Sequence, residues 1–130
     1  SITSFTELSK QAREVERSNR LTAIEKKEKN FVQKLINNED PIIASSDYTR
    51  AYPQLIGSYL SNSFVALGTD GFGRSDTREN LRKFFEIDKF QIVIAALDAL
   101  CDQGKIPKSV LKSALKKYNI NVNSEHPWNK

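Results

Sequence analysis

Glycines and arginines gather in the middle of the chain, and together these residue types could bind an anion. The set begins just after an apolar run and comprises Gly68, Gly71, Gly73, Arg74, Arg78 and Arg82. Glycine adopts positive φ angles at little cost, so successive backbone N–H groups of such a loop can converge on a phosphate or a carboxylate. The positive end of a following helix would strengthen the attraction, and the arginines would add charge.

A strand-to-helix turn explains part of the same segment without any ligand. Residues 64–67 form an apolar run of strand length, and Asp76 and Glu79 have the spacing of a capping box. In such a box Asp76 accepts the N–H of Glu79, and Glu79 reaches back to the cap. The glycine spacing matches neither the dinucleotide pattern G-x-G-x-x-G nor the Walker phosphate loop. An anion-binding loop and a structural turn both remain open at this point.

The composition predicts one globular domain that does not span a membrane. The chain has 130 residues, of which 38% are hydrophobic and 28% are charged. A chain of this length can bury roughly two-thirds of its unfolded surface, which is enough for a hydrophobic core. No apolar run approaches the roughly 18 residues that a membrane-spanning helix requires. The first residues are polar, so we expect no secretory signal.

The charges and the few reactive side chains exclude several kinds of site. The net charge is only +4, and lysines alternate with glutamates, as in residues 25–29, so we expect no nucleic-acid interface. Cys101 has no second cysteine to pair with and follows an apolar stripe, so we expect a buried, inert thiol. The only histidine, His126, stands in a polar tail, and no cluster of metal-ligand residue types is apparent.

Helices are predicted where apolar residues recur at helical spacing behind a capping residue. The predicted N-caps are Ser4, Asn30, the run of residues 45–47, Asp76 and Asp88, and Pro107 is predicted as the first residue of the last helix. The longest apolar stripe covers residues 89–103, and Gly104 stands where a left-handed C-terminal cap belongs. Pro53 interrupts the pattern of residues 48–59, which predicts a kink or a late helix start; we place the tyrosines of that helix at the core edge.

The strands predict the fold class. Residues 42–44 and 64–67 are apolar throughout, and residues 1–4 resemble the end of a further strand. Apolar strands that alternate with helices are typical of a mostly parallel sheet with helices on both faces, so we expect an α/β fold of three layers, α/β/α, with a mixed sheet. About three strands are fewer than such a sheet usually has. We therefore expect a single domain over residues 1–130, truncated at its N-terminal strands.

Several segments together resemble one enzyme family. They are residues 4–8, 15–17, 19–21, 44–48, 85–88 and 95–97 and, above all, Leu-Gly-Thr-Asp-Gly-Phe-Gly-Arg-Ser-Asp-Thr-Arg-Glu-Asn-Leu-Arg at residues 67–82. The chain resembles, almost from end to end, the C-terminal domain of the homodimeric pyruvate dehydrogenase decarboxylating component, in the transketolase-like superfamily. Residues 22–30 depart from the family, which usually has a proline-containing linker there.

The resemblance implies a parent enzyme that uses thiamine diphosphate and magnesium to decarboxylate pyruvate in the bacterial cytoplasm. The parent passes the acetyl unit to a lipoyl group of dihydrolipoyl acetyltransferase within a multienzyme complex. The family's two preceding domains hold the cofactor, so no catalytic, cofactor-binding or metal-binding residue is assigned to this chain. Its expected partners are those domains, the homodimer mate and the acetyltransferase, and the isolated chain is expected to be structural and inactive.

The 68–82 loop is the candidate site within that interpretation, as an interface between domains or a flank of the substrate channel. Ligands of open α/β sheets gather at the carboxyl ends of strands, where this loop is expected to lie. The candidate residues are Asp70, Gly71, Phe72, Gly73, Arg74, Ser75, Asp76 and Arg78. Two other hypotheses remain. The loop could form a stand-alone anion-binding or nucleotide-binding module, or uncovered apolar faces of the sheet could make the chain an interaction adaptor.

Overall fold

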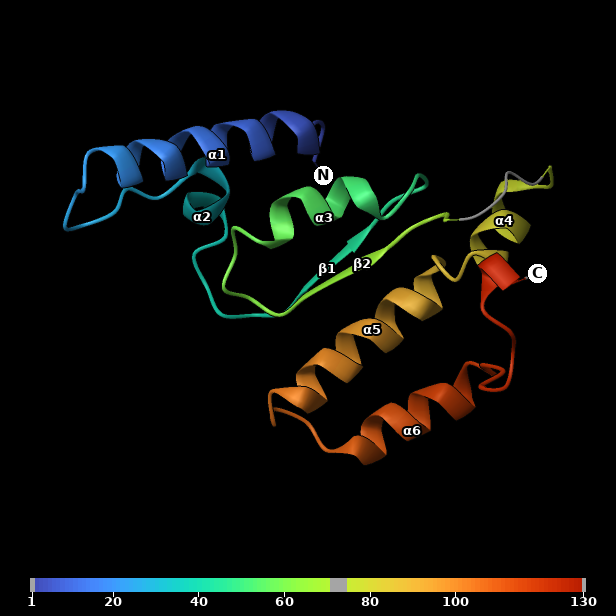
Figure 1. The fold of residues 1–130 in the computed structure, drawn as a ribbon. Coiled ribbons are helices and arrows are strands. Elements are labelled where there is room, and N and C mark those ends of the chain that lie inside the picture. Colours follow the sequence, from blue (N-terminus) through green and yellow to red (C-terminus); the bar gives the residue numbers. More distant parts are fainter. Residues whose placement is uncertain (1, 71–74, 130) are drawn as a thin grey trace.

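The chain is represented by a computed structural model that describes residues 2–70 and 75–129. Helices and strands alternate along it (Figure 1). The elements in chain order are α1 (Phe5–Leu21), α2 (Phe31–Leu35), β1 (Ile42–Ser45), α3 (Ala51–Gly57), β2 (Phe64–Leu67), α4 (Arg78–Phe84), α5 (Lys89–Asp102), α6 (Lys108–Lys117) and the 3-10 helix η1 (Pro127–Asn129).

The two strands form a parallel sheet between layers of helices. β1 and β2 pair in register, from Ile42 opposite Phe64 to Ser45 opposite Leu67. Helix α3 contacts β2, and α5 contacts β1 from the other side, while α1 packs on α3 and α6 packs on α5. Figure 1 shows this order as a stack with the sheet in the middle. The predicted α/β class, with helices on both faces of a parallel sheet, is confirmed.

The most deeply buried side chains lie where α1, α2 and α3 meet. Ala12 of α1, Val32 of α2 and Ile56 of α3 expose 1%, 2% and 1% of their surface, and Pro53 is buried beside Ile56. Burial of one aliphatic side chain of this size stabilises a fold by about 1.5–3 kcal/mol. This cluster therefore fixes α3, and with it the segment that enters α3 from β1.

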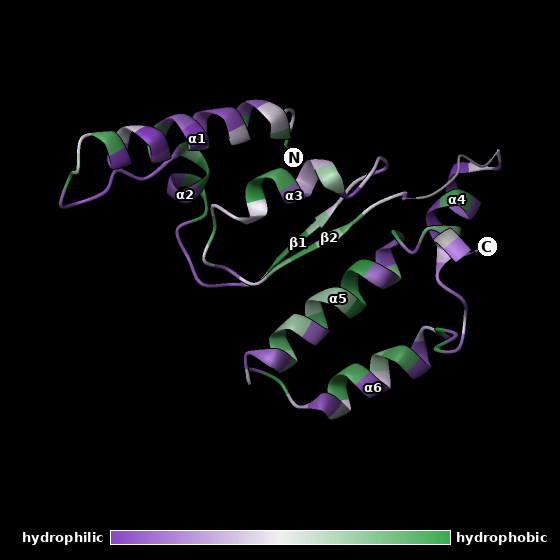
Figure 2. Ribbon diagram, viewed as in Figure 1, coloured by the Kyte–Doolittle hydropathy of each residue, from purple (hydrophilic) through white to green (hydrophobic). Residues whose placement is uncertain are grey.

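Helix α5 is apolar around most of its circumference, as Figure 2 shows. Its sequence between Phe90 and Leu100 has one charged residue, Asp98. A helix placed between a sheet and a second helix must bury two faces, and this position between β1 and α6 accounts for the pattern. The predicted caps are confirmed at both ends, because Asp88 accepts the N–H of Gln91 at 2.9 Å and Gly104 has a φ of 71°.

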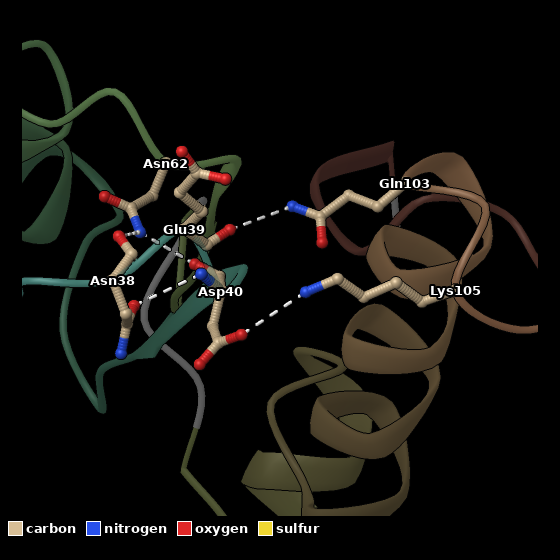
Figure 3. A network of polar contacts seen from close by, with 6 residues as sticks. All are labelled: Asn38, Glu39, Asp40, Asn62, Gln103 and Lys105. Carbon is tan, nitrogen blue, oxygen red and sulfur yellow. Dashed lines mark hydrogen bonds and ion pairs between the residues drawn. The ribbon is translucent and has the colours of Figure 1, made fainter.

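A polar network at the amino ends of the strands ties the α5–α6 turn to the sheet (Figure 3). The Asn62 amide donates to the carbonyl oxygens of Asn38 and Asp40, both at 2.8 Å. From the turn, the Gln103 amide donates to the Glu39 carbonyl at 3.2 Å, and Lys105 Nζ lies 3.4 Å from the Asp40 carboxylate. The position of the α5–α6 pair is therefore fixed at the end of the sheet opposite the 68–82 loop.

The predicted strand at residues 1–4 is wrong for the part that the structure describes. Among the described residues, β1 and β2 pair only with each other. Ser4 has extended backbone angles (φ −152°, ψ 97°), but it serves as the N-cap of α1 and accepts the Glu7 N–H at 3.2 Å. A helix cap and the end of a strand share these angles, so four residues could not distinguish them.

Two other predicted caps are displaced. Residues 45–47 do not cap α3, which begins at Ala51 behind Arg50 without a side-chain cap. This late start was one of the two outcomes predicted for Pro53, which has no N–H and fits only the first turn of a helix. Helix α4 is capped by Thr77, which accepts the Asn80 N–H at 3.3 Å, and not by Asp76.

The C-terminal helices are less buried than predicted. Pro107 is the N-cap of α6 and precedes its first residue. Cys101 is half-buried, and its sulfur lies 3.6 Å from the Pro107 carbonyl oxygen. In the stripe predicted as core, Phe90 and Val93 expose more than a third of their surface, since only part of α5 contacts the sheet or α6. The tyrosines of α3 also differ, because Tyr48 is 64% exposed.

Candidate functional site

The segments that follow β1 and β2 meet at the carboxyl edge of the sheet. Because the strands are parallel, both chains leave the sheet on the same side, and the Ser46 N–H donates to the Leu67 carbonyl at 2.9 Å. Just beyond, Thr69 N–H donates to the Tyr48 carbonyl at 2.9 Å, and the Thr69 hydroxyl donates to the Asp47 carbonyl at 3.1 Å. The first residues of the 68–82 loop are therefore bound to the turn between β1 and α3.

Gly68 permits this close approach. A Cβ atom at this position would lie 2.6 Å from the Arg50 nitrogen and 2.6 Å from the Tyr48 oxygen, both backbone atoms. Gly68 has no positive φ, unlike Gly104. The freedom predicted for an anion-binding loop is thus not used at Gly68, and the glycine is required because there is no room for a side chain.

Asp70 anchors the loop to the start of α3. Its Oδ1 accepts the Thr49 hydroxyl and the Arg50 N–H, each at 2.9 Å, and Oδ2 pairs with the Arg50 guanidinium. Burial alone would raise the pKa of Asp70, but the hydrogen bonds from the Arg50 backbone, the Arg50 side chain and Thr49 outweigh it and hold that pKa below its ordinary value. Asp70 therefore remains ionised as an internal partner of Arg50.

A second ion pair anchors the far end of the loop to the same turn. Arg82 of α4 binds Asp47 with both arms, Nε to Oδ1 at 3.1 Å and Nη2 to Oδ2 at 2.8 Å. The hydrogen bond from Arg82 lowers the pKa of Asp47, and the charges of Arg82 and Arg78 act in the same direction against a small effect of burial. Arg82, counted in the sequence as part of an anion cradle, is thus occupied by a carboxylate.

We expect Arg82→Ala to lower the free energy of unfolding by at most about 1 kcal/mol, because both side chains are largely exposed to solvent. The Asp47 pKa is depressed in the folded chain, so the contribution of the pair is present above the ordinary pKa of 3.8 and is lost as the pH falls below it. Urea unfolding at neutral pH and near pH 3 should show the difference only at neutral pH. Arg20→Ala, at the looser pair with Glu16, is the matched control; an equal loss at both pH values would contradict the assignment.

The candidate residues separate into two hollows. Asp70 lines a cavity of about 90 Å³ with Arg50, Gln91 and His126, which the C-terminal tail brings to the edge of the sheet. Asp76 and Arg78 line an open groove with Asp47 that continues past α4 to the segment after α6. Ser75 is exposed and lines neither hollow. Gly71, Phe72, Gly73 and Arg74 lie outside the described residues.

The sequence interpretation missed the residues that follow β1. Asp47 was assigned to a helix cap, and Thr49 and Arg50 were assigned no role, although all three hold the loop. A signal was available, because parallel strands deliver the residues after each of them to one edge. The position of His126 had no such signal, since it depends on the path of the tail after α6.

The described residues do not fit the cofactor that the resemblance implies. The 90 Å³ cavity is well below the roughly 300–1,000 Å³ of small-molecule sites, and its carboxylate already binds Arg50. No group of three or more histidine, cysteine, aspartate or glutamate side chains within residues 2–70 and 75–129 could hold a metal ion. In the same residues, no helix is both long enough and apolar enough to cross a membrane.

Comparisons with known proteins agree on one family. Residues 1–88 match the family described as the transketolase-like TK C-terminal domain. Three bacterial proteins named pyruvate dehydrogenase E1 component align with nearly the whole chain. That of Cupriavidus necator is 46% identical over 125 residues, that of Pseudomonas aeruginosa 42% over 129, and that of Escherichia coli 40% over 128. They cover 95%, 98% and 98% of this chain, which spans only 14%, 15% and 14% of their lengths.

Proposed function

We propose, from the premise that this chain belongs to the family of transketolase-like C-terminal domains, that it forms the C-terminal part of a pyruvate dehydrogenase. The observation that carries the proposal is the alignment of 95–98% of the chain with proteins of that name at 40–46% identity. The parent enzyme would decarboxylate pyruvate with thiamine diphosphate and magnesium and transfer the acetyl unit to a lipoyl group of dihydrolipoyl acetyltransferase. These relatives are bacterial, which favours a bacterial cytoplasmic enzyme.

Within that enzyme, the chain would act in structure and assembly. Its conspicuous charged side chains at the carboxyl edge of the sheet bind each other, as in the pairs of Asp70 with Arg50 and Asp47 with Arg82. Such pairs position a loop but leave their charges compensated. We therefore assign to the 68–82 loop a contact with the preceding domains or the homodimer mate, and we assign thiamine diphosphate and magnesium to those domains.

A polypeptide limited to residues 1–130 is expected to show no pyruvate decarboxylation and no binding of thiamine diphosphate with magnesium in titration calorimetry. The physical reason is the lack, among the described residues, of a cavity or ligand set suited to the cofactor. The protein as made in cells is expected to be several times larger than 14.8 kDa and to bind the cofactor. Saturable, magnesium-dependent binding by residues 1–130, or a full-length protein without decarboxylase activity, would refute the proposal.

The anion-binding hypothesis gains no support from the described geometry. Gly68 is a packing glycine, Arg82 is paired with Asp47, and α4 has only 7 residues, so its dipole is small. Two carboxylates, Asp47 and Asp70, stand at the same corner and would repel an anion. The structural turn, held by two ion pairs, accounts for the described part of the loop.

A further inference from the structure

The positive charge of the chain is concentrated in one segment. Residues 103–124 contain five lysines and no aspartate or glutamate, so this segment accounts for the whole net charge of +4. The segment includes α6 and the turns on either side of it. Lysines elsewhere alternate with acidic residues, and this contrast makes α6 the most strongly charged surface of the chain.

Two of the five lysines are engaged within the fold. Lys105 contacts Asp40 at 3.4 Å in the network of Figure 3. Lys108 lies 3.3 Å from Asp98 and 3.7 Å from Asp102, and the Asp98 carboxylate raises the pKa of Lys108. These two lysines hold α6 against α5 and the loop before β1.

The remaining lysines, Lys112, Lys116 and Lys117, lie on the outer face of α6. All three are exposed, together with Ser109 and Ser113, whereas Leu111, Ala114 and Leu115 are partly buried. On the inner side, the rings of Tyr118 and Phe90 pack at 4.9 Å between centroids. Among the described residues, ion pairs are recorded for Lys105 and Lys108 but not for these three. We call Lys112, Lys116 and Lys117 the α6 lysine face.

We propose that the α6 lysine face docks an acidic surface of the dihydrolipoyl acetyltransferase, an inference that rests on the proposed function. Charge complementarity selects an acidic partner, because unlike charges steer encounter and like charges penalise it. The face also lies in residues 89–130, beyond the part matched by the general family, while the pyruvate dehydrogenases align through it. A surface shared with those enzymes favours a partner from their complex.

The chemistry of the face favours protein over other polyanions. Single-stranded nucleic acids are bound by aromatic side chains that stack on bases, and the exposed positions around these lysines are serines. A helix that lies on a membrane pairs its basic face with a broad apolar face, but here Leu111 and Leu115 are turned inward and partly buried. The helix dipole accounts for lysines in the last turn, but Lys112 stands a full turn earlier.

The test compares two triple variants of the full-length enzyme. Lys112→Gln, Lys116→Gln and Lys117→Gln remove the face, and Lys26→Gln, Lys27→Gln and Lys29→Gln remove the same charge from the exposed 22–30 segment. Glutamine has nearly the helix propensity of lysine, so α6 should fold in both. The association rate with purified dihydrolipoyl acetyltransferase is measured by stopped flow at about 50 and 300 mM salt, and decarboxylation of pyruvate is followed with an artificial electron acceptor.

We expect the face variant to associate about tenfold more slowly than the control at low salt, with the difference largely lost at high salt. Decarboxylation with the artificial acceptor should be equal in both variants. Equal association rates, or an effect of the face variant on binding of RNA or anionic vesicles but not of the acetyltransferase, would overturn the docking inference alone. Absence of decarboxylation in the unmodified full-length enzyme would instead overturn the proposed function, and the inference with it.

Discussion

Gly68→Ala is expected to destabilise the chain by about 1–3 kcal/mol, because the new methyl group has no space. Its Cβ would stand 2.6 Å from two backbone atoms, the Arg50 nitrogen and the Tyr48 oxygen, and 2.8 Å from Arg50 Cγ. Backbone atoms cannot rotate away as a side chain can. The turn between β1 and α3 must therefore separate from the loop, which breaks the hydrogen bond from Thr69 N–H to Tyr48.

Gly57→Ala is the matched control for this substitution. Its Cβ would meet only the ring of Phe64, at 3.0 Å, and the ring can shift by a few tenths of an ångström. Alanine also gains up to about 1 kcal/mol over glycine within a helix, so the net change at Gly57 should be small. Urea unfolding followed by circular dichroism measures both variants. A Gly68→Ala protein within about 0.5 kcal/mol of the unmodified chain would show that the close approach is not required.

Features set by neighbouring residues could be predicted from the sequence. The capping box at Asn30 and Gln33, the start of α5 at Asp88 and the left-handed cap at Gly104 each depend on a few consecutive positions. The parallel pairing of β1 and β2 followed from their continuous apolar character and from the helix between them. Local signals therefore determine most of the element order and the fold class.

Features set by distant residues could not be predicted in the same way. Asp47 has the residue type and position of a helix cap, yet its partner is Arg82, 35 residues later in the chain. Gly68 has the composition signature of a phosphate loop, but its role depends on the backbone of the β1–α3 turn. Residue type indicates what a side chain can bind, whereas tertiary structure decides which partner reaches it first.

Asp70→Ala is expected to lower the free energy of unfolding by about 2–3 kcal/mol at neutral pH, since it removes the acceptor of several hydrogen bonds at once, one of them with a charged donor. The Thr49 hydroxyl and the Arg50 N–H lose partners at 2.9 Å, and the Arg50 guanidinium, 29% exposed, loses its counter-ion. Partial exposure lets water replace some of these contacts, which keeps the loss below that of a fully buried pair. The first residues of the 68–82 loop would then separate from α3.

The pH dependence distinguishes the charge of Asp70 from its hydrogen-bonding shape. Its pKa is depressed in the folded chain, so its stabilising contribution is present above the ordinary value of 3.8 and is lost as the pH falls through the lower, folded value. Asp70→Asn keeps an acceptor for Thr49 but removes the charge, so it should fall between Asp70→Ala and the unmodified chain at neutral pH. Unfolding curves for all three chains should converge near pH 3. If Asp70→Asn and the unmodified chain are equally stable at neutral pH, the pair with Arg50 contributes nothing to the anchor.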